Sequence, residues 1–147
     1  MSKLENTDEG KLSEDTEIMA FVYAALDTCT SGIVISDARM PDHPVIYINK
    51  AFENISGYTA AEVIGRNCRF LQGTDRQQAG RHKLREAIAT GEDVTVEIKN
   101  YTKEGRHFWN HLHISPIRNK AKEITHFIGV QIDITNDKDQ EEKVAIA

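Results

Sequence analysis

Three carboxamide side chains occur in segments where polar and apolar residues alternate. Asn100, Asn110 and Gln131 each lie in register with apolar residues that should face the protein interior. A buried amide is costly unless both its donor and its acceptor are satisfied. The three amides could satisfy one another or bind water. They could also bind a flat heterocycle whose edge offers alternating donors and acceptors, as the pyrimidine edge of a flavin does.

A second group with chemical potential is the thiol of Cys68, which lies in the segment GRNCRFLQG at residues 65–73. The neighbouring Arg66 and Arg69 could lower the pKa of this thiol and make it reactive. Most lone cysteines, however, are inert core residues. The chemistry of this segment alone leaves both interpretations open.

Four arginines lie in or soon after this segment, at Arg69, Arg76, Arg81 and Arg85. Arg81 and Arg85 are one helical turn apart and share one side of a helix. A phosphate group accepts several charge-assisted hydrogen bonds at once, so the set could hold a phosphate. The alternative is a solvated helix face whose charges are balanced by the acids at positions 86 and 92.

Other polar residues carry weaker signals. His111 and His113 share a strand face, but they lack a third ligand at suitable spacing, so we expect a surface or dimer-face role and no metal site. Trp109 is opposite in register to Asn110 and should therefore lie exposed on the outer sheet face, where it suggests an interface. Cys29 has no distinctive surroundings and is expected to be structural.

Five strands are expected to position these side chains. Apolar runs and period-two alternation predict strands over residues 32–36, 45–49, 94–100, 108–114 and 125–133. Turns are predicted at residues 41–44 and 103–105, because proline or glycine occurs there. Along this order, Phe127, Leu112, Val34 and Gly129 would provide apolar walls and space for a ring system.

Helical segments separate and flank these strands. Capping boxes over residues 59–62 and 74–77 predict two helices, the first ended by Gly65 and the second by Gly91. A further helix should begin at Ser13, and a charged helix should begin near Thr135. The expected organisation is a mobile N-terminal arm (1–12), an N-terminal flanking helix (13–30), a core (31–135) and a C-terminal flanking helix (136–147). This order predicts an α+β fold with one antiparallel sheet and helices on one face.

Bulk properties narrow the classes of function. A chain of 147 residues fits one domain with short flanks. The formal net charge of −5 argues against a nucleic-acid-binding surface. No apolar run reaches the length of a membrane span, and the N-terminus is unlike a signal peptide, so we expect a cytoplasmic protein without a membrane partner. The two cysteines form no disulfide framework.

Residues 65–73 resemble the signature of LOV (light-oxygen-voltage) domains of the PAS superfamily, in which the central cysteine is photoactive. The resemblance extends over roughly residues 31–135. It includes NKAF at 49–52, GY at 57–58, NY at 100–101, FWN at 108–110, FIGVQ at 127–131 and DIT at 133–135. It implies a PAS/LOV fold with a five-stranded antiparallel sheet, helices on one face, and flanking N- and C-terminal helices.

The resemblance implies that FMN is the cofactor and that Cys68 bonds reversibly to flavin C4a under blue light. With the wall residues named above, the expected flavin-binding set is Val34, Asn67, Arg69, Leu71, Gln72, Arg76, Arg81, Leu84, Arg85, Asn100, Asn110, Leu112, Phe127, Gly129 and Gln131. Arg81 departs from common plant LOV domains, which have an apolar residue there. Together with Arg76 it resembles the four-arginine phosphate clamp of some short bacterial LOV proteins without a fused effector.

The expected function is therefore that of a blue-light photoreceptor and not an enzyme. Its output would pass through the flanking helices of a homodimer to a downstream partner that the sequence does not identify. Two alternatives remain: a flavin redox-sensing PAS protein, or a ligand-free PAS module that serves dimerisation. The position of Cys68 in the intact LOV signature argues against both alternatives.

Overall fold

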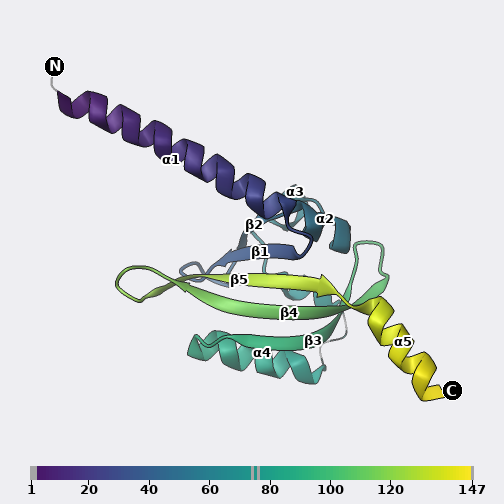
Figure 1. Cartoon of the computed structure of the whole chain (residues 1–147). Coiled ribbons are helices and arrows are strands. Elements are labelled where there is room, and N and C mark those ends of the chain that lie inside the picture. Colours follow the sequence, from purple (N-terminus) through teal and green to yellow (C-terminus); the bar gives the residue numbers. More distant parts are fainter. Residues whose placement is uncertain (1–2, 74, 76, 147) are drawn as a thin grey trace.

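A five-stranded antiparallel sheet forms the centre of the molecule (Figure 1). The computed structural model describes residues 3–73, 75 and 77–146. The strands are β1 (Gly32–Asp37), β2 (Val45–Ile48), β3 (Val94–Tyr101), β4 (His107–Arg118) and β5 (Ile124–Asp133). Their spatial order is β2-β1-β5-β4-β3, and each neighbouring pair is antiparallel. The predicted fold class is confirmed, and each predicted strand is present.

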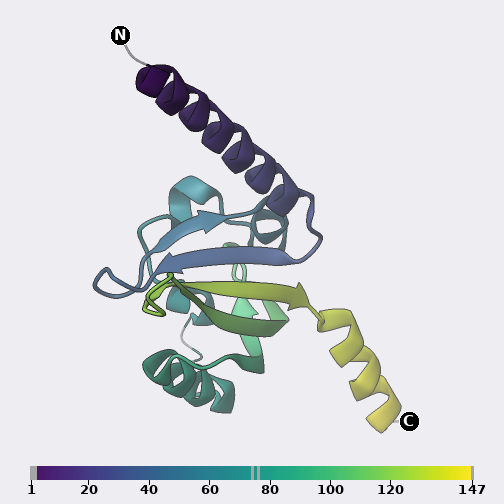
Figure 2. The same cartoon turned by 60° about the vertical axis from the view of Figure 1, so that its left-hand side comes forward.

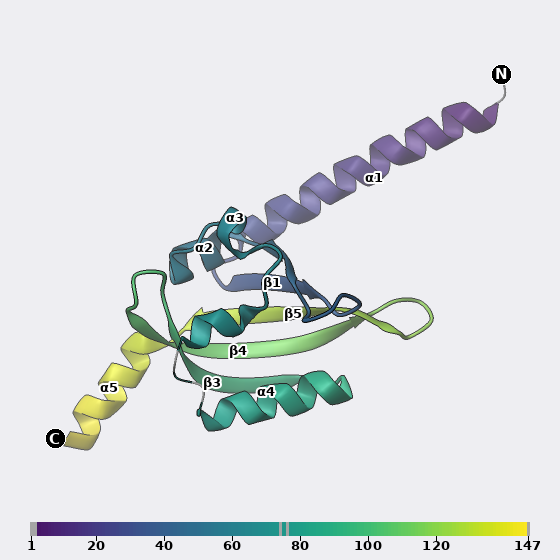
Figure 3. The same cartoon turned by 180° about the vertical axis from the view of Figure 1, so that it is seen from behind.

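One face of the sheet is covered by short helices (Figures 1 and 3). They are α2 (Lys50–Ser56), α3 (Ala60–Val63), the 3₁₀ helix η1 (Cys68–Gln72) and α4 (Ala79–Thr90). Local sequence sets their ends. Asn49 begins α2 by accepting a hydrogen bond from the Phe52 N–H, and Gly57 ends it in a left-handed conformation with φ of 77°. The predicted capping box of Thr59 and Glu62 begins α3.

Helix α4 begins later than the sequence predicts. The helix starts at Ala79 with Gln78 as its N-cap, so the predicted start at residues 74–77 is wrong, and positions 74 and 76 lie outside the described residues. The Gln78 side chain forms two hydrogen bonds with the backbone of Lys99 on β3. Its Nε2 donates to the carbonyl at 2.8 Å, and its Oε1 accepts from the N–H at 2.7 Å. This tertiary contact fixes the residue at which the helix begins. The helix ends at Gly91, as predicted.

The hydrophobic core has two parts, one under each end of the sheet. The first contains Val34, Val45, Ile48, Phe52, Val63 and Leu71. The second contains Leu84, Val96 and Ile98. Members of both parts line one cavity, so this cavity lies between the two packed regions.

Two helices flank the sheet and leave it in different directions (Figures 1 and 2). Helix α1 (Lys3–Thr28) projects away from the sheet, and helix α5 (Thr135–Ile146) follows β5. Helix α1 covers residues 3–12, which were expected to form a mobile arm, and so begins at Lys3 instead of Ser13. Residues such as lysine, leucine and glutamate favour helix, and no proline interrupts this segment. The boundaries of the functional units themselves remain predictions.

Helix α1 is joined to the core at its C-terminal end. The Leu26 carbonyl accepts a hydrogen bond from Asn49 Nδ2 at 2.8 Å, and the Asp27 carboxylate accepts one from the Lys50 N–H at 3.1 Å. On the N-terminal side of these contacts, the helix exposes apolar side chains, of which Phe21 is 74% exposed. Among the described residues, no helix is long and apolar enough to span a membrane.

Helix α5 is held to the sheet around Trp109 on β4. The Trp109 N–H donates to Thr135 Oγ1, and the Trp109 carbonyl accepts from the Ile134 N–H, both at 2.9 Å. Lys138 lies over the indole, with Nζ 5.3 Å from the ring centroid, and forms an ion pair with Glu97 on β3. The first turn of α5 is therefore bonded to the residue that precedes Asn110.

Candidate functional site

The inner face of the sheet and the helices enclose a cavity of about 880 Å³. This volume lies within the range of small-molecule and cofactor sites. The structure brings together at this cavity every predicted site residue that it describes: Val34, Asn67, Cys68, Arg69, Leu71, Gln72, Arg81, Leu84, Arg85, Asn100, Asn110, Leu112, Phe127, Gly129 and Gln131. Arg76 lies outside the described residues.

The three carboxamides meet at one end of the cavity because they share the inner face of β3, β4 and β5. All three are buried. Asn110 Nδ2 donates to Asn100 Oδ1 at 3.0 Å and to Gln131 Oε1 at 2.8 Å. The amides therefore do pair with one another, as one interpretation of the sequence anticipated. Their pairing is incomplete, however, because Asn110 Oδ1 is buried and has no hydrogen-bond partner in the described part of the chain.

A second buried acceptor, Gln72 Oε1, also lacks a partner among the described residues. Buried polar atoms in folded proteins are normally paired, with protein or with another molecule. Gln72 and Asn110 both line the cavity. The two unpaired acceptors thus fit a bound molecule that presents hydrogen-bond donors in two places, as the ring and the ribityl chain of FMN do.

Apolar side chains form the walls between these polar groups. Val34 on β1 and Phe127 on β5 are buried, and Leu112 on β4 is half-buried. Gly129 leaves space between them, since a Cβ atom there would lie 3.5 Å from Leu112 Cδ1, an ordinary van der Waals distance. A flat, largely apolar ring system with a polar edge matches these walls.

Cys68 begins η1, and the preceding residue holds this turn in place. Asn67 Oδ1 accepts a hydrogen bond from the Arg69 N–H at 2.9 Å, which caps the 3₁₀ helix. Burial raises the pKa of the Cys68 thiol to about 12. The idea that the neighbouring arginines lower this pKa is therefore wrong. Their guanidinium groups are engaged elsewhere, because Arg66 lies 4.3 Å from the Phe70 ring centroid and Arg69 pairs with Asp42.

Three arginines border the cavity near α4 and η1. Arg81 and Arg85 come from adjacent turns of α4, and Arg69 comes from η1. Both Arg69 and Arg85 are exposed, whereas Arg81 is half-buried. An anion at this edge of the cavity would therefore meet guanidinium groups from two different elements, which is the arrangement expected of a phosphate site.

The cavity also has lining residues that were not predicted. These are Ser36, Asp42, His43, Ile88, Ala89, Ile98 and Ile114. Strand alternation could have identified Ile98 and Ile114, which share the register of Asn100 and Asn110. No sequence signal places Asp42 and His43 there, because their position depends on a left-handed loop conformation.

The remaining candidates lie outside the cavity. His113 on the outer sheet face contacts Thr95 Oγ1 at 2.7 Å and Ser115 Oγ at 2.9 Å. In the described part of the chain, no group of three or more potential metal ligands comes together. Trp109 does lie on the outer face, but it is half-buried against Lys138 and not exposed as expected. Cys29 is exposed, and its thiol donates to the Ala25 carbonyl at 3.5 Å, so its structural role stays a prediction.

Comparison with known proteins identifies the family of this domain. Residues 30–136 match the model of the PAS domain family. The chain also covers 96% of the solved LOV domain of a blue-light-activated histidine kinase from Erythrobacter litoralis. That match has 39% identity, a TM-score of 0.68, and covers 71% of this chain. The chain belongs to the LOV domains of the PAS family.

This LOV domain is also similar to parts of larger proteins. It is 44% identical to Phototropin-2 of Oryza sativa subsp. japonica over 74% of this chain and 12% of that protein. It is 48% identical to a blue-light-activated histidine kinase of Rhizobium johnstonii over 76% of this chain and 32% of that protein. A solved RNA-binding light-oxygen-voltage receptor matches with a TM-score of 0.81 and 41% identity, over 89% of this chain and 37% of that one. The chain thus spans a minor part of these relatives.

Proposed function

We propose that this LOV domain is a blue-light photoreceptor that binds FMN and forms a reversible bond between Cys68 and flavin C4a. The observation that carries the proposal is the composition of the cavity. A neutral thiol, two buried acceptors without a partner among the described residues, and a set of arginines surround one apolar slot. The membership of the LOV family and the names of the blue-light-activated relatives support the same function.

The residues divide into groups by the part of FMN that each would hold. Asn100, Asn110 and Gln131 would bind the polar edge of the ring system, and Asn67 and Gln72 the ribityl chain. The phosphate would lie against the guanidinium groups of Arg69, Arg76, Arg81 and Arg85. Apolar contacts to the rings would come from Val34, Leu71, Leu84, Leu112 and Phe127, with Gly129 providing space.

The protonated state of Cys68 suits this role. With a pKa of about 12, the side chain is a thiol at neutral pH and so is a poor nucleophile in darkness. Bound FMN supplies the light absorption and the excited state that make addition possible. Cys68 would supply the sulfur that adds to C4a and the proton that leaves the thiol for N5. It would regain this proton as the bond breaks in darkness.

The output would pass from the cavity to the flanking helices. Asn110 faces the cavity, and the adjacent Trp109 bonds to the first turn of α5. The apolar side chains exposed on α1 suit a homodimer, because a second copy would cover them. The net charge of −5 supports the prediction that nucleic acid is not a partner. Cytoplasmic location and the absence of enzymatic turnover also remain predictions.

One experiment tests the function against its two alternatives. The purified protein should be yellow, lose its blue absorption under blue light, and recover it in darkness. Cys68→Ala should keep the flavin and lose the bleaching, because the substitution removes only the sulfur. Cys29→Ala is the matched control and should bleach like the unsubstituted protein. A colourless protein would indicate a dimerisation module, and a yellow protein that does not bleach would indicate a redox sensor.

A further inference from the structure

The loop between β1 and β2, residues 38–44, reaches the edge of the cavity. Asp42 and His43 at its tip both line the cavity. Both have left-handed backbone conformations, with φ of 65° and 44°. Asp and His adopt this conformation more readily than most residues, and contacts with the rest of the protein hold the tip in place.

Three contacts hold this tip, and all involve residues of the cavity. Asn67 Nδ2 donates to the Asp42 carbonyl at 2.8 Å. The Asp42 carboxylate accepts a hydrogen bond from Arg69 Nη2 and forms an ion pair with it. The His43 ring stacks on Phe127, with the centroids 5.7 Å apart and an interplanar angle of 30°. Two groups assigned to the flavin, on Asn67 and Arg69, are thus bound to the loop.

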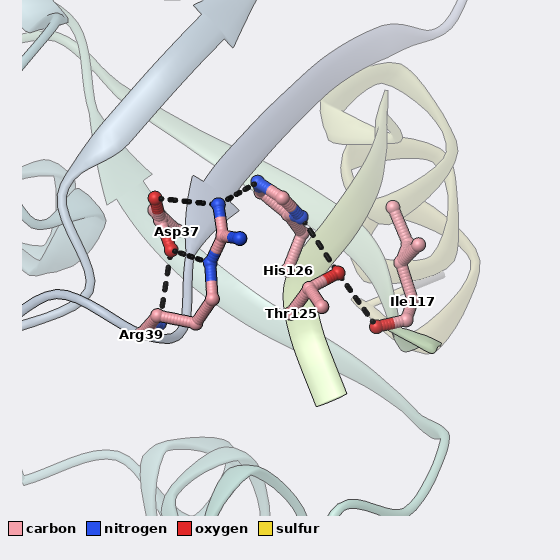
Figure 4. A network of polar contacts seen from close by, with 5 residues as sticks. All are labelled: Asp37, Arg39, Ile117, Thr125 and His126. Atoms are coloured by element: carbon pink, nitrogen blue, oxygen red, sulfur yellow. Dashed lines mark hydrogen bonds and ion pairs between the residues drawn. The ribbon is translucent and has the colours of Figure 1, made fainter. Parts of the chain in front are cut away.

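The base of the loop is held by a separate network, drawn in Figure 4. The Asp37 carboxylate accepts from the Arg39 N–H at 2.9 Å and from Arg39 Nε at 3.1 Å. Arg39 Nη2 donates to His126 Nε2 at 3.5 Å, and the other nitrogen of this ring contacts Thr125 Oγ1 at 2.8 Å. This network does not involve Arg69, so the base of the loop is attached to β5 independently of the Asp42–Arg69 ion pair.

We infer that Asp42 competes with the flavin phosphate for Arg69 and thereby lowers the preference of the site for FMN over riboflavin. The inference rests on the proposed function. A carboxylate and a phosphate are both anions that accept hydrogen bonds from a guanidinium group. An incoming phosphate must therefore displace the Asp42 carboxylate or bind beside a like charge, and either outcome weakens FMN binding. Riboflavin has no phosphate and can bind while Asp42 remains on Arg69.

The test is the affinity of the flavin-free protein for FMN and for riboflavin, measured by fluorescence titration. Asp42→Asn should raise the ratio of the riboflavin Kd to the FMN Kd by about two- to fivefold, the scale of a half-exposed ion pair. The riboflavin Kd itself should stay nearly constant. The matched control is Asp93→Asn, which removes the same charge from an exposed side chain at the turn before β3 and should leave the ratio unchanged.

A double-substitution experiment shows whether Asp42 acts through Arg69. In an Arg69→Ala background, Asp42→Asn should no longer change the ratio, because the group for which both anions compete is gone. A lower ratio in Asp42→Asn would overturn the inference, since Asp42 would then position Arg69 for the phosphate. An unchanged ratio would also overturn it. If the unsubstituted protein binds neither flavin, the proposed function fails and the inference fails with it.

Discussion

Gln131→Leu should uncouple the photochemistry from the flanking helices. The substitution keeps the approximate size of the side chain and removes both of its polar ends. In the flavin-free protein it removes the acceptor of the 2.8 Å bond from Asn110 Nδ2. Asn110 still donates to Asn100, so no donor group is left wholly unpaired. The free energy of unfolding should therefore fall by only about 0.5–1.5 kcal/mol, the net value of one hydrogen bond.

The larger effect concerns the light-induced state. With FMN bound as proposed, flavin N5 would be an acceptor in darkness, and in the bonded state it would carry a proton and act as a donor. Gln131 can meet this change only by turning its amide, because one end donates and the other accepts. Leaving the mismatch uncorrected in a buried site would cost about 1–3 kcal/mol. That energy is enough to shift a two-state equilibrium roughly 5- to 150-fold.

The structure indicates how a turn of the Gln131 amide would affect the neighbouring residues. Gln131 Oε1 now accepts from Asn110 Nδ2, so a turned Gln131 would present a second donor to the same NH₂ group. Asn110 would have to turn as well, and the unpaired Asn110 Oδ1 could then accept from Gln131. The neighbouring Trp109 bonds to Thr135 at the start of α5. The change would thus reach the helix through one step along β4.

Hydrogen exchange in darkness and under light, over residues 14–27 and 136–146, measures this coupling. The unsubstituted protein should lose protection in these helices under light, and Gln131→Leu should still bleach while most of that change disappears. Cys68→Ala under the same illumination controls for heating. If Gln131→Leu retains the full light-induced change in exchange, Gln131 does not belong to the signalling route.

Three further predictions concern the phosphate site, the ring space and acid stability. Arg81→Ala should weaken FMN binding by about one to two orders of magnitude, the effect of losing a charge-assisted hydrogen bond, and should weaken riboflavin binding much less. If titrations show equal weakening for both flavins, Arg81 acts through folding. Gly129→Ala should lower flavin content, while the free energy of unfolding of the flavin-free protein changes by less than about 1 kcal/mol, since the added methyl only contacts Leu112. The Lys103 side chain and the Thr59 backbone hold the pKa of Glu62 at about 2, below its ordinary value of 4.5. The stabilisation from Glu62 is therefore present above pH 4.5 and lost as the pH falls towards 2, so Glu62→Gln should flatten this part of the acid-unfolding curve.

Strand alternation carried most of the prediction of the fold and the ring-binding residues. Because successive side chains point to opposite faces of a sheet, the spacing of Asn100, Asn110 and Gln131 was enough to place them on one buried face. The same rule placed Trp109 on the other face. Sequence reasoning therefore worked where a period of two residues fixes the direction of a side chain.

Contacts between distant segments account for two of the errors. The start of α4 depends on Gln78 bonding to Lys99, which no local capping rule contains. Burial raises the pKa of Cys68, and the nearby Arg69 pairs with Asp42, 27 positions away in the chain. In both cases the local pattern does not contain the partner that the fold brings to it.

The burial of Cys68 has a consequence for the chemical lifetime of the protein. Oxidants and alkylating agents attack the thiolate, and a pKa of about 12 leaves about one molecule in 10⁵ in that form at pH 7. Cys29, by contrast, is exposed to solvent. In an oxidising solution, Cys29 should therefore be oxidised before Cys68. A preparation in which two chains have become linked by a disulfide between their Cys29 residues should still respond fully to light.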